Sequence, residues 1–162
     1  MRKIIILSLL IIAFCAVNAF ATDGKIYPGS MGVKWSSSEP DPVLSFGAIG
    51  NPSATKWLRL DLPVIHDSIN HSISDGWVKA IDMHYSSNIS ARMYSVYRSG
   101  CGWYGWLSPN QITSGSNCTA QTLSFGALGS NSSAHYYYSC TIPPTYNGQV
   151  SYIVSYKVNE KE

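Results

Sequence analysis

The chain has 162 residues, of which 12% are charged and 12% aromatic. Its first 21 residues hold two cations and no acid, so the remainder carries nine Lys and Arg against nine Asp and Glu and is formally neutral. Neutrality argues against a nucleic-acid ligand, whose binding needs Lys and Arg to displace counterions, and against electrostatic capture by anionic lipid. About 140 residues suffice for one core, so we expect a single domain.

The chain begins with an expected signal peptide, residues 1–21. Arg2 and Lys3 precede an apolar run, and Ala19 and Ala21 place small residues where a signal peptidase reads them. The run is shorter than the ~20 apolar residues that a membrane-spanning helix needs. We therefore expect a mature chain, residues 22–162, that is secreted or periplasmic and not inserted in a membrane.

Beyond the signal peptide the sequence predicts strands and no helix. Seven runs alternate apolar with polar residues or are rich in β-branched and aromatic ones, and Gly, Pro, Ser and Asn clusters separate them. The predicted strands cover residues 31–36, 56–62, 77–85, 89–97, 119–125, 135–142 and 149–158. Short strands in this number favour an all-β fold, an antiparallel β-sandwich of two packed sheets.

A heptapeptide recurs in the chain: LSFGAIG at 44–50 returns as LSFGALG at 123–129. A turn, a strand-like run and a proline follow each copy. The apolar residues of the two runs share one phase, Leu58, Leu60 and Leu62 in the first and Tyr138, Cys140 and Ile142 in the second. We therefore expect a tandem repeat of two sequence-related halves, about 27–86 and 87–158, each forming either part of both sheets or one whole sheet.

Three cysteines remain after signal cleavage, and an odd number in an oxidising compartment leaves one without an intramolecular partner. Cys101 and Cys118 bracket an insertion that the first half lacks, and a disulfide closing a loop of this size stabilises by about 3 kcal/mol. We expect that disulfide. Cys140 lies on the apolar face of its strand, so we expect a buried, unpaired thiol. The alternative is an exposed thiol that is reactive or pairs between chains.

The segment between Cys101 and Cys118 carries the candidate binding residues Trp103, Tyr104 and Trp106. Exposed flat rings stack on the apolar face of a pyranose, with roughly 1 kcal/mol from each large aromatic contact beyond area. The alternative is that Trp103 and Trp106 fold back and cap an open end of the sandwich. In the run 136–138, strand alternation predicts that Tyr137 faces opposite to its neighbours.

A second candidate set combines imidazoles and carboxylates. Neutral imidazole and carboxylate are zinc ligands, and an Asp-His pair is part of a hydrolase triad. The spacing matches no metal motif, and neither G-x-S-x-G nor H-E-x-x-H occurs. We therefore expect a solvated polar edge, with no cofactor, no metal and no catalytic residue. The set is His66, Asp67, His71, Asp75, Asp82 and His84.

Three segments resemble those of a group of short, uncharacterised secreted bacterial proteins with no established function. They are YPGSMGVKW at 27–35, the block 44–63 and YYYSCTIPP at 136–144. The resemblance implies secretion and nothing catalytic. Chains of this group have cysteines near the positions of Gly32, Leu62 and Ala91, so the loss of a partner would explain the unpaired Cys140.

These observations favour a secreted, non-enzymatic binding or surface-associated module. Carbohydrate is the leading ligand class, because the neutral chain is rich in Ser, Asn, Gly, Tyr and Trp, a composition that suits recognition of hydroxylated surfaces. The other partner that we consider is another surface component. One alternative is a small extracellular metal-dependent hydrolase that uses the set from His66 to His84. The other is a structural or self-associating envelope protein, which low charge and an odd cysteine would suit.

Overall fold

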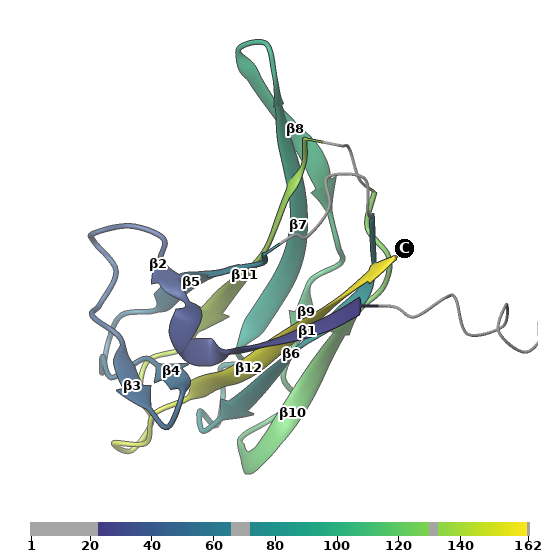
Figure 1. Ribbon diagram of the computed structural model, residues 1–162. Coiled ribbons are helices and arrows are strands. Elements are labelled where there is room, and N and C mark those ends of the chain that lie inside the picture. Colours follow the sequence, from purple (N-terminus) through teal and green to yellow (C-terminus); the bar gives the residue numbers. More distant parts are fainter. Residues whose placement is uncertain (1–22, 66–71, 130–132, 162) are drawn as a thin grey trace, which may run out of the picture.

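The computed structural model describes residues 23–65, 72–129 and 133–161, which form an antiparallel β-sandwich (Figure 1). The helical structure in the described residues is a single 3-10 turn, η1, at Gly29–Met31. In this part of the chain no helix is long and apolar enough to cross a bilayer. The expected signal peptide lies outside the described residues. So do His66, Asp67 and His71 of the second candidate set.

One sheet, which we call sheet A, has the strand order β10-β6-β12-β4-β3, with β1 also paired to β12. Strand β12 is its centre, because β6 lies along one side of it and β1 and β4 share the other side. The strands are β1 Asp23–Pro28, β3 Val43–Ser45, β4 Ala48–Gly50, β6 Ser72–Asp82, β10 Asn117–Phe125 and β12 Tyr152–Lys161.

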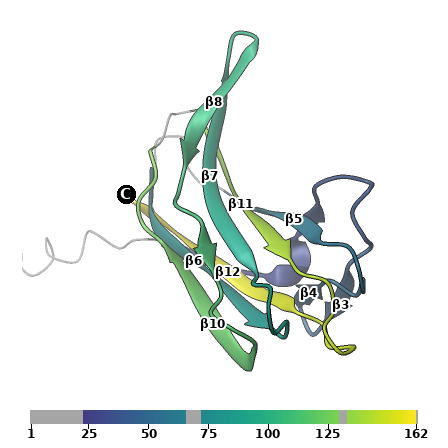
Figure 2. The same ribbon diagram turned by 180° about the vertical axis from the view of Figure 1, so that it is seen from behind.

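The other sheet, sheet B, has the order β2-β5-β11-β7-β8, with β9 also paired to β7. Its strands are β2 Val33–Lys34, β5 Leu58–Pro63, β7 Ser90–Ser99, β8 Gly102–Leu107, β9 Gln111–Ile112 and β11 His135–Ile142. Strands β7 and β8 form a hairpin that projects beyond the rest of the sandwich at one end, as Figures 1 and 2 show from opposite sides.

The core lies between the sheets and is built by strand alternation. In β5 and β11, Leu60 stands directly opposite Cys140, and every second residue on either side of this pair is buried. The predicted phase of these two strands is therefore confirmed, and each fully buried aliphatic side chain contributes about 1.5–3 kcal/mol. Burial raises the pKa of the Cys140 thiol well above its ordinary value, so this cysteine is the buried thiol that the sequence predicts.

Each sheet contains strands from both predicted halves, so the halves do not form one sheet each. The repeated heptapeptide also adopts two different structures. Residues 44–50 form most of the β3–β4 hairpin, whereas residues 123–129 form the end of β10 and the loop after it. A structural repeat is therefore not confirmed, although the strands that follow the two copies share their phase.

The predicted disulfide between Cys101 and Cys118 is not formed, and both residues are exposed free thiols. Cys101 lies in the turn between β7 and β8 of sheet B, while Cys118 lies near the start of β10 in sheet A. The prediction was wrong because the intervening residues are not a closed loop. Part of that segment is strand β8, which pairs with β7 in the projecting hairpin and places Cys101 at its tip.

The resemblance implies cysteines at positions 32, 62 and 91, and the structure places position 91 beside Cys140 and position 32 beside position 62. Ala91 in β7 is the direct cross-strand partner of Cys140 in β11. A Cβ atom at Gly32 would lie 2.9 Å from the side chain of Leu62. A cysteine at position 91 would therefore stand opposite Cys140.

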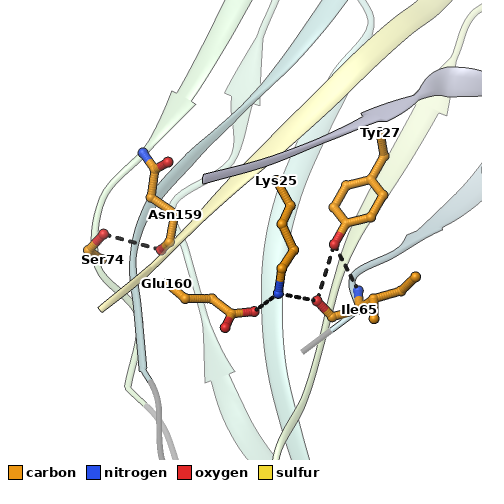
Figure 3. A network of polar contacts seen from close by, with 6 residues as sticks. All are labelled: Lys25, Tyr27, Ile65, Ser74, Asn159 and Glu160. Atoms are coloured by element: carbon orange, nitrogen blue, oxygen red, sulfur yellow. Dashed lines mark hydrogen bonds and ion pairs between the residues drawn. The ribbon is translucent and has the colours of Figure 1, made fainter. Parts of the chain in front are cut away.

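A polar network fastens the start of β1 to the end of β12 and to the residues after β5 (Figure 3). Lys25 Nζ lies 3.0 Å from a carboxylate oxygen of the buried Glu160 and 3.3 Å from the Ile65 carbonyl oxygen. The Tyr27 hydroxyl donates to the same carbonyl at 3.1 Å and accepts from the Ile65 amide at 3.3 Å. Because a buried charge left without its partner is costly, this network fixes one end of the sandwich.

Candidate functional site

The three predicted binding residues lie on strand β8, the outer strand of the projecting hairpin. Trp103 is 69% exposed, Tyr104 55% and Trp106 41%. Trp103 is therefore displayed to solvent and does not cap the sandwich. Trp106 partly caps the sandwich, because its ring lies close to the other sheet. A Cβ atom at Gly129, beyond β10, would lie 2.8 Å from that ring.

Strand alternation separates these three side chains. Trp103 stands opposite Arg98 of β7, on the face of sheet B that points away from sheet A, which we call the outer face. Tyr104 and Trp106 stand opposite Tyr97 and Ser95, on the face that carries the core further along β7. The register therefore points the Trp103 side chain away from those of Tyr104 and Trp106, although all three residues line one hollow beside β8.

Two further rings join Trp103 on the outer face. Tyr94 of β7 and Tyr137 of β11 are cross-strand partners, and their rings stack with centroids 5.0 Å apart and planes inclined by 5°. Tyr137 does face opposite to its neighbours, as predicted, since Tyr136 and Tyr138 are buried. We call Tyr94, Tyr137 and Trp103 the aromatic platform.

A hollow of about 200 Å³ lies beside this platform, with Tyr94 and Trp103 but not Tyr137 in its lining. The other residues that line it are Val96, Tyr104, Gly105, Trp106 and Leu107. Glycine is required at position 105, because a Cβ atom there would lie 2.1 Å from the Ser95 carbonyl oxygen. The glycine that interrupts the aromatic run therefore lets β8 approach β7 closely.

A polar row crosses the outer face next to the Tyr94–Tyr137 pair. In the register of β5, β11 and β7, Asp61 stands opposite Ser139, and Ser139 stands opposite Arg92. Asp61 Oδ1 and Arg92 Nε are buried, and neither has a hydrogen-bond partner among the described residues. This row therefore retains hydrogen-bonding capacity that no residue in the described part of the chain uses.

Burial also sets the electrostatics of this row. Desolvation raises the pKa of Asp61, against the lowering effects of a hydrogen bond from Ser139 and of the nearby Arg59 charge. The pKa of Tyr137 is raised as well, first by desolvation and then by the Asp61 carboxylate and Tyr94. The tyrosine hydroxyl therefore stays protonated at neutral pH and is able to donate a hydrogen bond.

The opposite face of the hairpin carries a second aromatic group. The ring centroid of Tyr97 lies 5.9 Å from that of Tyr104 and 5.6 Å from that of Trp106. The Trp106 ring also lies close to Gly129, and the Tyr104 ring lies close to Gly102. We interpret them as the packing that holds the projecting hairpin in place.

The described members of the second candidate set, Asp75, Asp82 and His84, do not lie together as a site. The buried Asp82 carboxylate accepts hydrogen bonds from the amides of His84 and Ile89, both at 3.0 Å, and from the Ser151 and Thr113 hydroxyls. His84 lies beyond the end of β6, and its Nδ1 accepts from two backbone amides. Asp82 and His84 therefore stabilise the turn after β6.

Asp75 lies seven residues from Asp82 on β6, which is ~23 Å along an extended strand. Asp75 is bonded instead to Ser74 and Asn159. Within residues 23–65, 72–129 and 133–161, no three His, Cys, Asp or Glu side chains are grouped as metal ligands.

Sheet A also has a hollow on its outer face, of about 290 Å³. It is lined by Ser45, Phe46, Ala48, Ile81, Tyr152 and Val154, none of which is charged. The hollow on sheet B differs from it in lying next to Asp61 and Arg92, each of which holds a buried polar atom without a hydrogen-bond partner among the described residues.

Sequence reasoning identified Trp103 but missed Tyr94, Asp61 and Arg92. Asp61 lies on β5, and only the pairing of β5 with β11 brings it beside the platform. Arg92 and Tyr94 lie two residues apart on β7. The available signal was alternation in β7, which places Arg92, Tyr94, Val96 and Arg98 on the face opposite to Ala91 and Met93.

No protein-family model matches the chain, and no curated protein matches it. A solved structure described as a low-affinity xylan-binding module, CBM86, from the gut symbiont Roseburia intestinalis is similar to 86% of this chain and 96% of its own length. The identity is 13% and the TM-score 0.51. The CBM36-1 domain of a multidomain xylanase from the hindgut metagenome of Trinervitermes trinervoides matches over 85% and 96%, with 9% identity and a TM-score of 0.44. The first of these likenesses shows that the two chains share a β-sandwich fold.

Proposed function

We propose that this protein is a secreted, non-enzymatic module that binds carbohydrate on the outer face of sheet B. The observation that carries the proposal is the aromatic platform, Tyr94, Tyr137 and Trp103. Tyr94 and Trp103 line an open hollow, and the platform lies beside the polar row Asp61, Ser139 and Arg92. Secretion rests on the expected signal peptide in residues 1–21.

The two parts of the face match the two chemical surfaces of a sugar. A pyranose ring presents C–H groups that pack on flat aromatic rings, and hydroxyls that exchange hydrogen bonds with polar side chains. Asp61 and Arg92 are only partly buried, so each side chain can meet a ligand hydroxyl. Among the described residues, each also holds a buried atom without a hydrogen-bond partner, and such an atom carries a desolvation cost. The apolar hollow on sheet A offers no such row.

The openness of the face indicates a ligand that is a chain. The platform lies on the flat side of a sheet and extends onto the projecting hairpin, so a polymer can lie across it. Stacking on two or three rings at roughly 1 kcal/mol each gives modest affinity. The β-sandwich shared with a xylan-binding module is in keeping with this ligand class.

Binding of the secreted form, residues 22–162, to a glycan array and to insoluble polysaccharides tests the proposal. Trp103→Ala and the double variant Tyr94→Ala/Tyr137→Ala should each weaken binding about fivefold or more, because each removes stacking worth roughly 1 kcal/mol or more. Tyr85→Ala is the control, since Tyr85 is an aromatic residue about as exposed as Trp103, at 73% against 69%, and is located between β6 and β7.

If both platform variants bind as tightly as the wild type, and thermal melts show that they are folded, the proposal is wrong. Binding by none of the proteins to any polysaccharide would also remove it. The envelope-protein alternative would then be the better one, and sedimentation at high concentration would test it.

A further inference from the structure

The outer face of sheet B is positively charged, although the mature chain is formally neutral. Among the described strand residues on this face, the cations are Arg59, Arg92 and Arg98, and the carboxylate is Asp61. His135, opposite Val96, adds a titratable imidazole. The platform therefore lies in a local excess of guanidinium groups.

One of the three arginines is already engaged within the protein. The Arg59 guanidinium lies 4.4 Å from the centre of the Trp35 ring, a cation–π contact, and its backbone amide donates to Glu39. Arg59 and Glu39 thus belong to the edge of the sheet near β2. The other two guanidinium groups, on β7, lie beside the platform.

Arg92 and Arg98 bracket the platform along β7. Arg92 stands opposite Ser139 next to the Tyr94–Tyr137 pair, and its Nε atom is buried without a partner. Arg98 is exposed and stands opposite Trp103. Among the residues that the structure describes, neither takes part in a salt bridge; the ion pairs formed there join Lys25 to Glu160 and Lys34 to Asp41.

We propose that the ligand is an acidic polysaccharide, whose anionic groups pair with Arg92 and Arg98 while its sugar rings stack on the platform between them. This inference rests on the proposed function and names its substrate class. A guanidinium presents a planar fork of N–H donors that matches carboxylate or sulfate oxygens. The shared chemistry is an oxyanion carried on a sugar chain.

The separation of the two arginines adds a length requirement. Six residues of extended strand span ~20 Å, so a single sugar cannot reach both groups. A polymer that lies along β7 meets Trp103 and Arg98 at one end and the tyrosine pair and Arg92 at the other. Affinity should therefore rise with chain length until both arginines are engaged.

The probe is polygalacturonate, compared with the same polymer after chemical reduction of its carboxyl groups, and with dextran sulfate beside uncharged dextran. Binding is measured by affinity electrophoresis and calorimetry at low salt and at about 1 M salt, where the Debye length falls to about 3 Å. The variants are Arg98→Gln and Arg92→Gln. Lys79→Gln is the control, because it removes the same charge from an exposed site on sheet A.

We expect an acidic polymer to bind more tightly than its uncharged counterpart, and the difference to shrink at high salt. Arg98→Gln should weaken acidic binding two- to about fivefold, as an exposed ion pair does, and Arg92→Gln by about tenfold, since its contact is partly desolvated. Lys79→Gln should bind like the wild type. If only one of the two acidic polymers gives this pattern, the proposal is supported and the anion is identified. Polygalacturonate alone identifies a carboxylate, and dextran sulfate alone identifies a sulfate.

Equal binding of charged and uncharged polymers, unaffected by Arg98→Gln, overturns this inference while leaving carbohydrate binding intact. An equal loss in Lys79→Gln also overturns it, because the attraction would then come from overall charge. No binding of any polymer removes this inference and the proposed function together. Arg92→Lys covers the case in which Arg92→Gln misfolds: it keeps the charge but loses the planar fork, so acidic binding should still weaken.

Discussion

The two copies of the repeated heptapeptide have almost the same sequence but different structures. In the first copy Phe46 is fully exposed, and in the second Phe125 is 4% exposed in the core. The rings differ because Phe46 lies in the turn of the β3–β4 hairpin, whereas Phe125 is the last residue of β10.

The flanking residues explain the difference. Pro42 precedes the first copy and Asn51-Pro52 follows it, so the segment is cut short and can form only a tight hairpin. The second copy continues a strand that is already paired with β6, with Phe125 opposite Gly76 and its ring 5.2 Å from that of Tyr138. Pairing within the sheet therefore decides the conformation of an almost identical sequence.

The largest contrast between the copies should be seen at the phenylalanine. Phe125→Ala should lower the free energy of unfolding by about 3–5 kcal/mol, because it leaves a cavity in the core. Phe46→Ala should change it by less than about 0.5 kcal/mol, because the ring contributes no burial. Urea denaturation of both variants measures this. Equal losses in the two variants would show that Phe46 is buried in solution by some partner.

The sixth position of the heptapeptide should show the second contrast. Ile49 is fully buried between Leu44 and Ile153 in the sheet, while Leu128 is only partly buried against the core. Ile49→Ala should cost about 2–4 kcal/mol and Leu128→Ala about 1 kcal/mol, in proportion to the area each removes from the core. Thermal melts of the two variants check the order. A larger loss for Leu128→Ala contradicts the burial seen here.

Strand alternation made much of the fold predictable from the sequence. The strands with the clearest period, 135–142 and 149–158, correspond to β11 and most of β12. Strand β8 was missed because Gly102 and Gly105 interrupt its aromatic residues, a pattern typical of loops. Strand β1 was missed because six residues that include Gly24 and Pro28 carry little strand signal.

The candidate site could be predicted only in part, and the reason is register. Composition identified an exposed tryptophan in the segment 101–107, but alternation along β8 separates Trp103 from Tyr104 and Trp106. The partners of Trp103 come from β7, and from β11 beyond it. Which residue of one strand stands opposite which residue of another depends on the whole sheet, and no local pattern in this chain encodes it.

The fourth position should separate the copies through backbone geometry. Gly47 has a φ of 82°, which a residue with a Cβ atom adopts only with strain, whereas Gly126 has no positive φ and nothing near its Cβ position. Gly47→Ala should therefore cost about 1–2 kcal/mol and Gly126→Ala close to nothing. Urea midpoints provide the comparison. A neutral Gly47→Ala would mean that the hairpin turn relaxes to another conformation.

The smallest effect should be a gain, and it comes from the same turn. Phe46 and Gly47 are its two loop residues, with φ values of 47° and 82°, which is the pattern of a type I′ hairpin. That turn favours Asn-Gly, and a phenylalanine with positive φ pays about 1 kcal/mol for its conformation. Phe46→Asn should raise the free energy of unfolding by up to about 1 kcal/mol. Phe46→Ala is the control. It removes the ring, as Phe46→Asn does, but alanine keeps the strain of a positive φ, so the difference between the two variants is the contribution of the asparagine. If Phe46→Asn and Phe46→Ala are both less stable than the wild type, the ring itself stabilises the hairpin, where it lines a hollow with Ile81 and Tyr152.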